Sequence, residues 1–403
     1  MSLPVLKLRP KEDKRLRQGH VWIYSNEVDT KATPLKDFEP GAQVIVENSQ
    51  GKALGVAYVN PNSLICARLL SRRAKPFGRG QLLQRLEQAL ALRDACFDKP
   101  FYRWVYGESD GLPGLVIDRF GDYVVVQIST AGMEAMKSQI QGAITRVPGL
   151  ELKGLLWKND GKMRVQEGLD EYVEVAADVG DGEVPQQVRI EENGTLFDVP
   201  VYDGQKTGWF YDHRLNRERI NRLVKGKRVL DICSYAGGWG VQAATAGASE
   251  VVCVDISAQA LDWVAHNAEI NGVADKVVCL QGDAFKAMEQ LTTEMQKFDV
   301  VILDPPAFIP KKKDIGPGER AYEKLNQMGM RLLGQEGFLV SASCSMHLAE
   351  HRLVDMLQKA GRHLDRSVQI IERGSQGPDH PVHPAIVETR YIKSLLCRVA
   401  LSQ

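Results

Sequence analysis

Cys344 stands at a point in the chain where a simple core residue is not expected. It follows GFLVSAS at residues 337–343, an apolar run typical of a buried strand, and it lies between two serines. A thiol at a strand end meets solvent or ligand, and its thiolate is a strong nucleophile suited to covalent catalysis. Free cysteine also packs as a small apolar side chain. The position alone therefore leaves a catalytic and a packing interpretation open.

Aspartates close the four strand-like runs that precede this cysteine. The runs RVLDICS, EVVCVDI, KVVCLQGD and FDVVILDPP carry at their ends Asp231, Asp255, Asp283 and Asp304. One aspartate in such a place is often only a turn or helix-cap residue. Four in succession are not required by core packing, because a carboxylate is costly to bury unpaired. The series indicates a ligand site at one edge of a sheet.

The elements that must position these residues follow from the pattern after residue 190. Near-continuous apolar runs alternate there with helical segments, which predicts a parallel, doubly wound, Rossmann-like α/β domain over residues 191–403. Its clearest helix begins after Ser257, a good N-cap, and ends near Gly272. In such sheets the ligand binds beyond the carboxyl ends of the strands, where the aspartates and Cys344 fall.

Two further domains are expected before residue 191. Residues 1–75 contain short β-type runs separated by glycine, asparagine and proline, which predicts a small β barrel or mixed β domain. Residues 76–190 begin with leucines at helical spacing and continue with strands, including a hairpin that turns at Gly121 and Asp122. We interpret this second segment as a connecting α+β domain.

The charge of the chain is balanced overall but uneven along its length. The 403 residues include 51 basic and 51 acidic side chains. Residues 48–86 contain no acidic side chain and several basic ones, Arg72 and Arg73 among them, whereas residues 165–200 are strongly acidic. A basic face on a neutral protein predicts contact with a polyanion, although a solvated surface would have the same composition.

Composition also excludes several classes of protein. No apolar stretch of about 18 residues occurs and no signal peptide is evident, so we expect a cytoplasmic protein without membrane contact. The seven cysteines show no CxxC spacing, which predicts neither a disulfide framework nor a metal site. We interpret Cys253 and Cys279 as core residues, and His380 and His383 as loop residues because no third ligand is evident.

The glycine turn and the acids resemble the class I methyltransferases that bind S-adenosylmethionine. The turn reads DICSYAGGWG at residues 231–240 and lacks the phosphate fingerprint of dinucleotide-binding folds. The resemblance implies that Gly237 and Gly238 approach the methionine part of the cofactor. It further implies that Asp255 holds the ribose and Asp283 meets the adenine amine. The same site would include Asp231, Tyr235 and Asp304.

A narrower resemblance extends over most of the chain. Five motifs in order, GQKTGWFYDHRLNR, DICSYAGGWG, DPPAF, RAYEKLN and SCS, resemble the RlmI-type cytosine-5 methyltransferases of large-subunit ribosomal RNA. The early segment RQGHVWIYSNEV is similar to the PUA domain of that family, a small RNA-binding β barrel. The resemblance implies a PUA-like domain at 1–75, the connecting domain at 76–190 and the methyltransferase domain at 191–403. It also implies ribosomal RNA as the partner and a homodimer.

The resemblance supplies a chemical role for the thiol. In cytosine-5 RNA methyltransferases a cysteine after the fifth strand adds to carbon 6 of cytosine, and Cys344 stands at that position. Asp304 would contact the polar edge of the flipped base. Many members of the wider class carry a second cysteine after this aspartate, but here Pro-Pro-Ala-Phe follows, so the base that removes the carbon 5 proton is unassigned.

The remaining candidates surround this centre. Lys206 and Tyr211 lie in the segment that the family lays across its cofactor. Phe308 can stack on the target base or anchor its own loop. The other substrate-binding candidates are basic: Lys311, Lys312, Lys313, Arg72 and Arg73.

Two alternatives stay open. A guanine N-methyltransferase of ribosomal RNA would use Asp304, the prolines and Phe308 to orient a base nitrogen, and it would not need Cys344. An RNA-binding assembly factor with a vestigial cofactor site is the other alternative. The joint presence of the acids, the glycines and the thiol argues against it.

Overall fold

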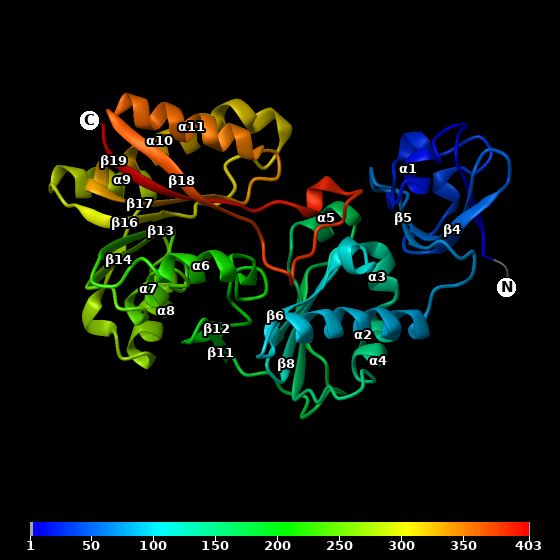
Figure 1. The fold of residues 1–403 in the computed structure, drawn as a ribbon. Helices are drawn as coiled ribbons and strands as arrows, with labels where there is room; N and C mark the ends of the chain where they lie inside the picture. The colour runs from blue at the N-terminus through cyan, green and yellow to red at the C-terminus, as the bar shows by residue number, and fades with distance from the viewer. Residues whose placement is uncertain (1–2, 403) are drawn as a thin grey trace. The chain divides into compact units, whose positions relative to one another are not determined.

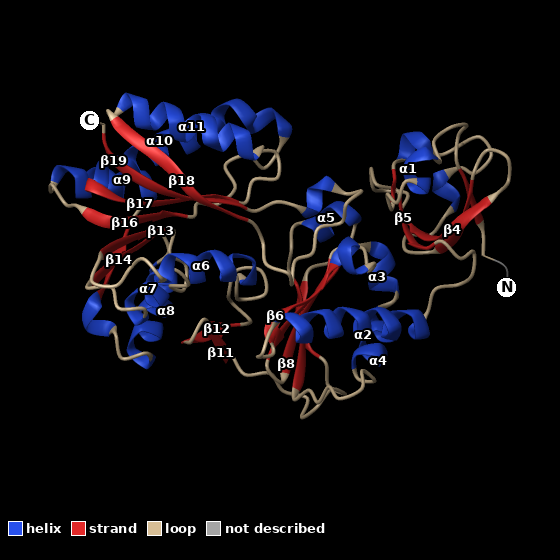
Figure 2. Ribbon diagram, viewed as in Figure 1, coloured by secondary structure: helices blue, strands red, loops and turns tan. Residues whose placement is uncertain are grey.

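A computed structural model describes residues 3–402, and Figure 1 labels its helices and strands while Figure 2 colours them by type. The chain divides into two compact units. The first consists of the residues up to Val188, Pro200–Trp209 and Pro378–Thr389. The second consists of Arg189–Val199, Phe210–Gly377 and the residues from Arg390 onward. The three-domain division at residues 75 and 190 stays a prediction.

The first unit begins with a five-stranded sheet whose strand order is β1-β3-β4-β5-β2. Its elements are β1 (Val5–Lys7), α1 (Lys14–Arg17), β2 (Trp22–Ile23), β3 (Gln43–Glu47), β4 (Ala53–Val59) and β5 (Ala67–Ser71). Alternate residues of β3 are buried, so Val44 and Val46 enter a small core together with Leu6 and Ile23. The expected small β domain is therefore present in this stretch of the chain.

A second five-stranded sheet of the same unit has the order β10-β9-β8-β7-β6. Its strands are β6 (Phe101–Tyr106), β7 (Leu115–Phe120), β8 (Tyr123–Ile128), β9 (Gly154–Asn159) and β10 (Tyr172–Val175), and its helices are α2 (Arg79–Cys96), α3 (Ala131–Ala135), α4 (Lys137–Ile144) and α5 (Met163–Glu167). The predicted hairpin is confirmed, because β7 and β8 pair across Gly121, whose φ is +69°. The predicted helix is α2, which buries Leu82 and Leu86 against the sheet.

The second unit contains a seven-stranded sheet of order β15-β14-β13-β16-β17-β19-β18. Its strands are β13 (Arg228–Ile232), β14 (Glu250–Asp255), β15 (Val277–Gln281), β16 (Phe298–Leu303), β17 (Leu333–Ser343), β18 (Arg366–Gly374) and β19 (Lys393–Leu401). A short hairpin, β11 (Gln187–Glu192) with β12 (Thr195–Pro200), precedes the sheet. The strands from β15 to β17 are parallel, which confirms the doubly wound α/β class.

Helices cover both faces of this sheet (Figure 1). They are α6 (Arg214–Asn221), α7 (Gly240–Thr245), α8 (Ala258–Ile270), α9 (Ala284–Thr293), α10 (Ile315–Leu332) and α11 (Glu350–His363). Helices α9, α10 and α11 share one apolar core with Leu230, Ile232 and Leu339 of the sheet. The predicted cap of α8 is confirmed, because the Ser257 hydroxyl accepts the Ala260 N–H at 3.2 Å. No helix within residues 3–402 is long and apolar enough to cross a membrane.

Two expectations about this sheet are wrong. Strand β19 is antiparallel to both β17 and β18, so the sheet is mixed rather than wholly parallel. Cys279 is exposed rather than buried, because its strand β15 is an edge strand. An edge strand lacks a neighbour on one side, which the apolar run KVVCLQGD does not reveal. Cys253, one strand further in, is buried as expected.

Candidate active site at the carboxyl ends of the strands

The turn after β13 carries left-handed backbone at three alternate residues. The φ angles are +66° at Cys233, +49° at Tyr235 and +84° at Gly237. A Cβ at Gly237 would lie 2.5 Å from Val241 Cγ2, so only glycine fits there. Left-handed non-glycine residues are strained and persist only where surrounding contacts hold them. Here the Tyr235 N–H donates to Asp255 Oδ2 at 2.9 Å.

Asp231 supports this turn from inside the sheet. The sequence placed it at the end of a strand, but it lies within β13 and is fully buried. Its Oδ2 accepts the Gly240 N–H at 2.9 Å, whereas Oδ1 has no hydrogen-bond partner among residues 3–402. Burial raises the pKa of this carboxyl to about 8, and the negative charges of Asp304 and Asp255 add to the effect. The side chain therefore organises the glycine turn rather than facing solvent.

The next two aspartates lie at the open edge of the sheet. Both oxygens of Asp255 accept backbone N–H groups, from Tyr235 and from Ser257, each at 2.9 Å. Asp283 is exposed and caps α9 by accepting the Phe285 N–H at 3.1 Å. Ile256, directly after Asp255, is 71% exposed. Acidic groups beside an exposed apolar side chain and a glycine turn suit a nucleoside that carries an amino-acid tail.

Asp304 and Cys344 follow neighbouring parallel strands, β16 and β17. The Cys344 Sγ lies 4.0 Å from the carbonyl oxygen of Pro305, in the loop that begins at Asp304. Trp239 Nε1 donates to Asp304 Oδ2 at 2.9 Å, and His213 Nε2 lies 3.5 Å from Oδ1. The structure thus brings together the two residues to which the sequence assigned the chemistry, and it fixes the orientation of the carboxylate.

Lys393 belongs to this centre, although the sequence did not single it out. It lies opposite Ser343 in the antiparallel pairing of β17 and β19, and its Nζ donates to the Ser345 carbonyl at 2.5 Å. Only 5% of the residue is exposed. Burial lowers the pKa of the ammonium group to about 8, while the negative charge of the Cys344 thiolate acts in the opposite direction. The buried ammonium group is therefore close enough to Cys344 for the two charges to interact.

A hydroxyl network fixes the backbone on both sides of Cys344. The Tyr322 hydroxyl lies 2.9 Å from Ser343 Oγ and 2.8 Å from Ser345 Oγ. Ser345 Oγ also accepts the Ile309 N–H at 3.1 Å. Tyr322 comes from the RAYEKLN motif, so that motif connects the thiol loop to the loop after Asp304. Phe308 packs in the same place, with its ring centroid 4.8 Å from that of Tyr322.

The other candidates lie around this centre or in the first unit. Tyr211 is buried, and the Arg214 guanidinium lies 5.2 Å from its ring centroid. The three lysines from Lys311 to Lys313 are exposed just before α10. Lys206 belongs to the first unit and is exposed with a φ of +53°.

The basic stretch over residues 48–86 is not a uniform surface. Arg72 and Arg73 are exposed after β5. Arg68, in contrast, is buried, and its Nη1 lies 3.2 Å from Glu167 Oε1. Arg85 donates to the carbonyl oxygens of Gly111 and Leu70. Two of the basic side chains are therefore structural, which leaves Arg72 and Arg73 among those able to meet a polyanion.

Comparisons with known proteins agree with this geometry. Residues 6–72 match a PUA-like domain family, and residues 167–398 match a family of S-adenosylmethionine-dependent methyltransferases. The chain is 35% identical to the ribosomal RNA large subunit methyltransferase I of Vibrio cholerae, over 98% of this chain and 99% of the relative. It is 36% identical to the protein of that name from Aliivibrio fischeri, over 96% and 97%.

Solved structures show the same fold. The methyltransferase SMU.776, solved in complex with SAH, superposes with a TM-score of 0.82 at 20% identity, covering 98% of this chain and 100% of that one. A SAM-dependent methyltransferase from Streptococcus mutans gives a TM-score of 0.81 with the same coverage and identity. The chain therefore belongs to the S-adenosylmethionine-dependent methyltransferases, in the family of the ribosomal RNA large subunit methyltransferase I proteins.

Proposed function

We propose that this enzyme forms 5-methylcytidine in large-subunit ribosomal RNA, with Cys344 as a covalent catalyst. The observation that carries the proposal is the position of Cys344: its thiol lies 4.0 Å from the Pro305 carbonyl of the Asp304 loop, and the next residue, Ser345, accepts a hydrogen bond from the buried Lys393 ammonium. A cation beside a thiol favours the thiolate, which is the reactive form. An enzyme that methylates a base nitrogen has no use for such an arrangement.

The proposed reaction has three steps: addition of the thiolate, transfer of the methyl group and elimination of the thiolate. The thiolate of Cys344 adds to carbon 6 of cytosine, and the electron pair of the 5,6 double bond becomes available at carbon 5. Bound S-adenosylmethionine would supply an electrophilic methyl group: carbon 5 would form the new C–C bond as the S–CH3 bond breaks, and S-adenosylhomocysteine would leave with the electron pair of that bond. Loss of the carbon 5 proton to a base then restores the double bond and expels the thiolate. The Asp304 carboxylate, held by Trp239, faces the polar edge of the base during these steps.

The cofactor would lie along the edge formed by the ends of β13, β14 and β15. The glycine turn, with Gly237 and Gly238, would take the methionine part, since residues without side chains let the backbone approach a ligand closely. Asp255 would hold the ribose and Asp283 the adenine amine, with Ile256 against the adenine face. The remaining cofactor contacts in this proposal are Tyr235, Tyr211, Lys206 and Asp304, whereas Asp231, predicted as a contact, is fully buried and would act by holding the glycine turn.

RNA would be held by both units. The PUA-like domain contributes Arg72 and Arg73, and the loop before α10 contributes Lys311, Lys312 and Lys313, all of them exposed. Such side chains neutralise backbone phosphates. Phe308 would line the pocket for the flipped base. A homodimer is the oligomeric state that we propose.

The test is nucleoside mass spectrometry of unmodified large-subunit ribosomal RNA after incubation with the enzyme and S-adenosylmethionine. We expect 5-methylcytidine with the native chain and none with Cys344→Ala, while calorimetry shows that the variant still binds the cofactor. Cys279→Ala is the matched control, because Cys279 is exposed at a distant edge of the same sheet. A methylated guanosine that forms equally well with Cys344→Ala would replace the proposal with the guanine N-methyltransferase.

A further inference from the structure

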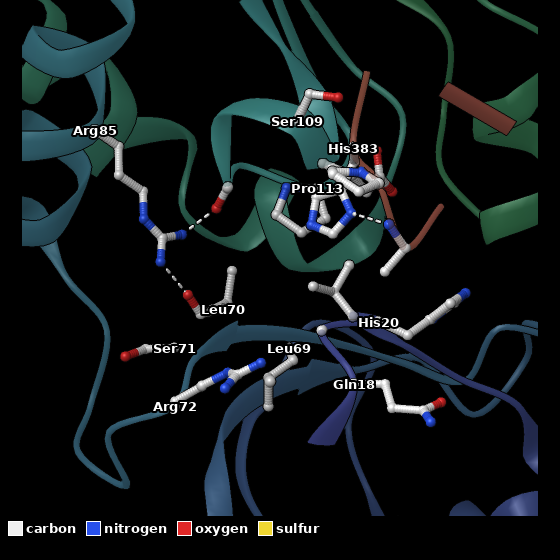
Figure 3. A pocket seen from close by; sticks show the side chains of 16 residues that line it. Gln18, His20, Leu69, Leu70, Ser71, Arg72, Arg85, Ser109, Pro113 and His383 are labelled. Carbon is white, nitrogen blue, oxygen red and sulfur yellow. Dashed lines mark hydrogen bonds between the residues drawn. The ribbon is translucent and has the colours of Figure 1, made fainter. Parts of the chain in front are cut away.

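The first unit contains a cavity of about 550 Å³ (Figure 3). Four separate stretches of chain line it: residues 18–21 before β2, residues 69–72 at the end of β5, residues 108–113 around the turn before β7, and residues 383–385. All of these residues lie in one compact unit. Binding sites for small molecules and single nucleotides have volumes of roughly 300–1,000 Å³, so the cavity is large enough for a nucleotide.

Hydrogen bonds hold the walls of this cavity in place. Arg85 joins two of the stretches by donating to the carbonyl oxygens of Leu70 and Gly111. The Leu69 N–H donates to the Val21 carbonyl at 2.8 Å, which fixes a third stretch. The fourth is held where the His383 N–H donates to Thr389 Oγ1 at 2.8 Å. The walls of the cavity are therefore fixed by hydrogen bonds.

Several polar groups of the lining have no partner among residues 3–402. The Arg72 guanidinium is exposed and makes no ion pair or hydrogen bond there, and Figure 3 shows it opposite His383 across the cavity. His383 Nδ1 accepts the Ala385 N–H at 3.2 Å, which leaves Nε2 as a free donor. The Ser109 hydroxyl also has no partner there, but its oxygen is fully buried and does not face the cavity.

The charged side chains that line the cavity favour an anionic ligand. Its carboxylate, Glu108, lies 4.0 Å from the Arg68 guanidinium and accepts a hydrogen bond from Trp22 Nε1 at 2.8 Å. Arg72 and Arg85 are the cations of the lining, and Arg85 donates to backbone carbonyl oxygens, so the exposed Arg72 is the one that favours an anion. Gly19 leaves the space beside it open, since a Cβ there would lie 4.0 Å from Arg72 Nη2. An anion next to the flat faces of an imidazole and of Pro113 is the chemistry of a nucleoside phosphate.

We propose that this cavity binds one unpaired nucleotide of the RNA substrate, with its phosphate on Arg72 and its base against His383. The nucleotide differs from the methylated one, because none of the residues that line this cavity is among those around Cys344. The inference rests on the proposed action on RNA. It adds a recognition site for an unstacked base, made of other residues than the reaction centre.

The experiment measures binding of a large-subunit RNA fragment by fluorescence anisotropy over a range of salt concentrations, using the full-length chain. We expect Arg72→Ala to weaken binding about tenfold and to reduce the dependence of log affinity on log salt by roughly one phosphate contact. We expect His383→Ala to weaken binding about fivefold with an unchanged salt dependence, because it loses stacking rather than charge. Arg146→Ala is the matched control, since Arg146 is an exposed arginine of the same unit away from the cavity.

Equal affinities for His383→Ala and the native chain would overturn the inference, even if Arg72→Ala binds more weakly. Adenosine monophosphate serves as a second probe. We measure its competition with the RNA at micromolar concentration in the native chain and in His383→Ala. If adenosine monophosphate competes equally well in both chains, the cavity is not a nucleotide site. If adenosine monophosphate binds tightly but neither Arg72→Ala nor His383→Ala changes the affinity for RNA, the ligand is a free nucleotide and the RNA assignment is wrong.

The methylation assay separates this inference from the proposed function. Normal 5-methylcytidine formation at saturating RNA, with a raised KM in Arg72→Ala and His383→Ala, supports both. Normal KM values in the variants reject the cavity site alone. RNA binding that depends on His383 without any 5-methylcytidine product rejects the proposed reaction alone.

Discussion

Replacing Asp231 by asparagine removes a buried carboxyl group whose ionisation opposes folding. Asp231 is fully buried in β13, and the only hydrogen bond of its side chain among residues 3–402 is the one that it accepts from the Gly240 N–H at 2.9 Å. An asparagine side chain has almost the same shape and can accept the same bond. It cannot ionise, so the comparison of Asp231→Asn with the native chain isolates the effect of the proton.

The raised pKa of Asp231 determines how the free energy of unfolding changes with pH. Burial raises the pKa of Asp231 from 3.8 to about 8, so this group stabilises the fold fully below pH 3.8 and loses that contribution as the pH rises towards 8. Each pH unit in that window costs about 1.4 kcal/mol. Between pH 5 and pH 7 the native chain should lose about 2.7 kcal/mol relative to Asp231→Asn. Between pH 7 and pH 9 the further loss falls to about 1.4 kcal/mol.

The assay is hydrogen–deuterium exchange in urea at pH 5, 7 and 9, corrected for intrinsic exchange rates and followed in peptides from β13 and α7. Other titrating groups cancel because only the difference between the two chains is used. Ser257→Ala, in the same unit, provides a change of stability without a titrating group. A difference between Asp231→Asn and the native chain that stays constant from pH 5 to pH 9 would refute the buried, protonated carboxyl.

Three further outcomes are expected. Lys393→Met should shift the pH midpoint for alkylation of Cys344, followed by peptide mass spectrometry, upward, because the thiolate loses a nearby cation; Lys393→Arg should largely restore it. Gly240→Ala should lower the free energy of unfolding by about 1–3 kcal/mol, because its Cβ would lie 2.3 Å from Cys253 Sγ; Cys253→Ala in the same chain should recover part of the loss. Ser257→Ala should cost about 1 kcal/mol through loss of the cap on α8, and no change in urea midpoint would contradict that role.

Much of the second unit was predictable from the sequence, because the signals involved are local. Apolar runs of strand length alternate with helical segments, and each of the five runs corresponds to one of the strands from β13 to β17. The cap at Ser257 and the end of α8 before Gly272 depend only on neighbouring residues. The meeting of Asp304 with Cys344 follows from one rule, since the carboxyl ends of neighbouring parallel strands lie at one edge.

Only the tertiary structure decided which strands are neighbours and which are edges, and that is where the sequence reading was wrong or silent. Cys279 is exposed because β15 is an edge strand, although its run is as apolar as that of buried Cys253. Lys393 reaches the Ser345 carbonyl beside Cys344 only because β19 inserts between β17 and β18. A hydrophobic pattern along the chain indicates which side chains are buried. It does not indicate which distant segment covers them, because strand pairing depends on contacts across the whole sheet.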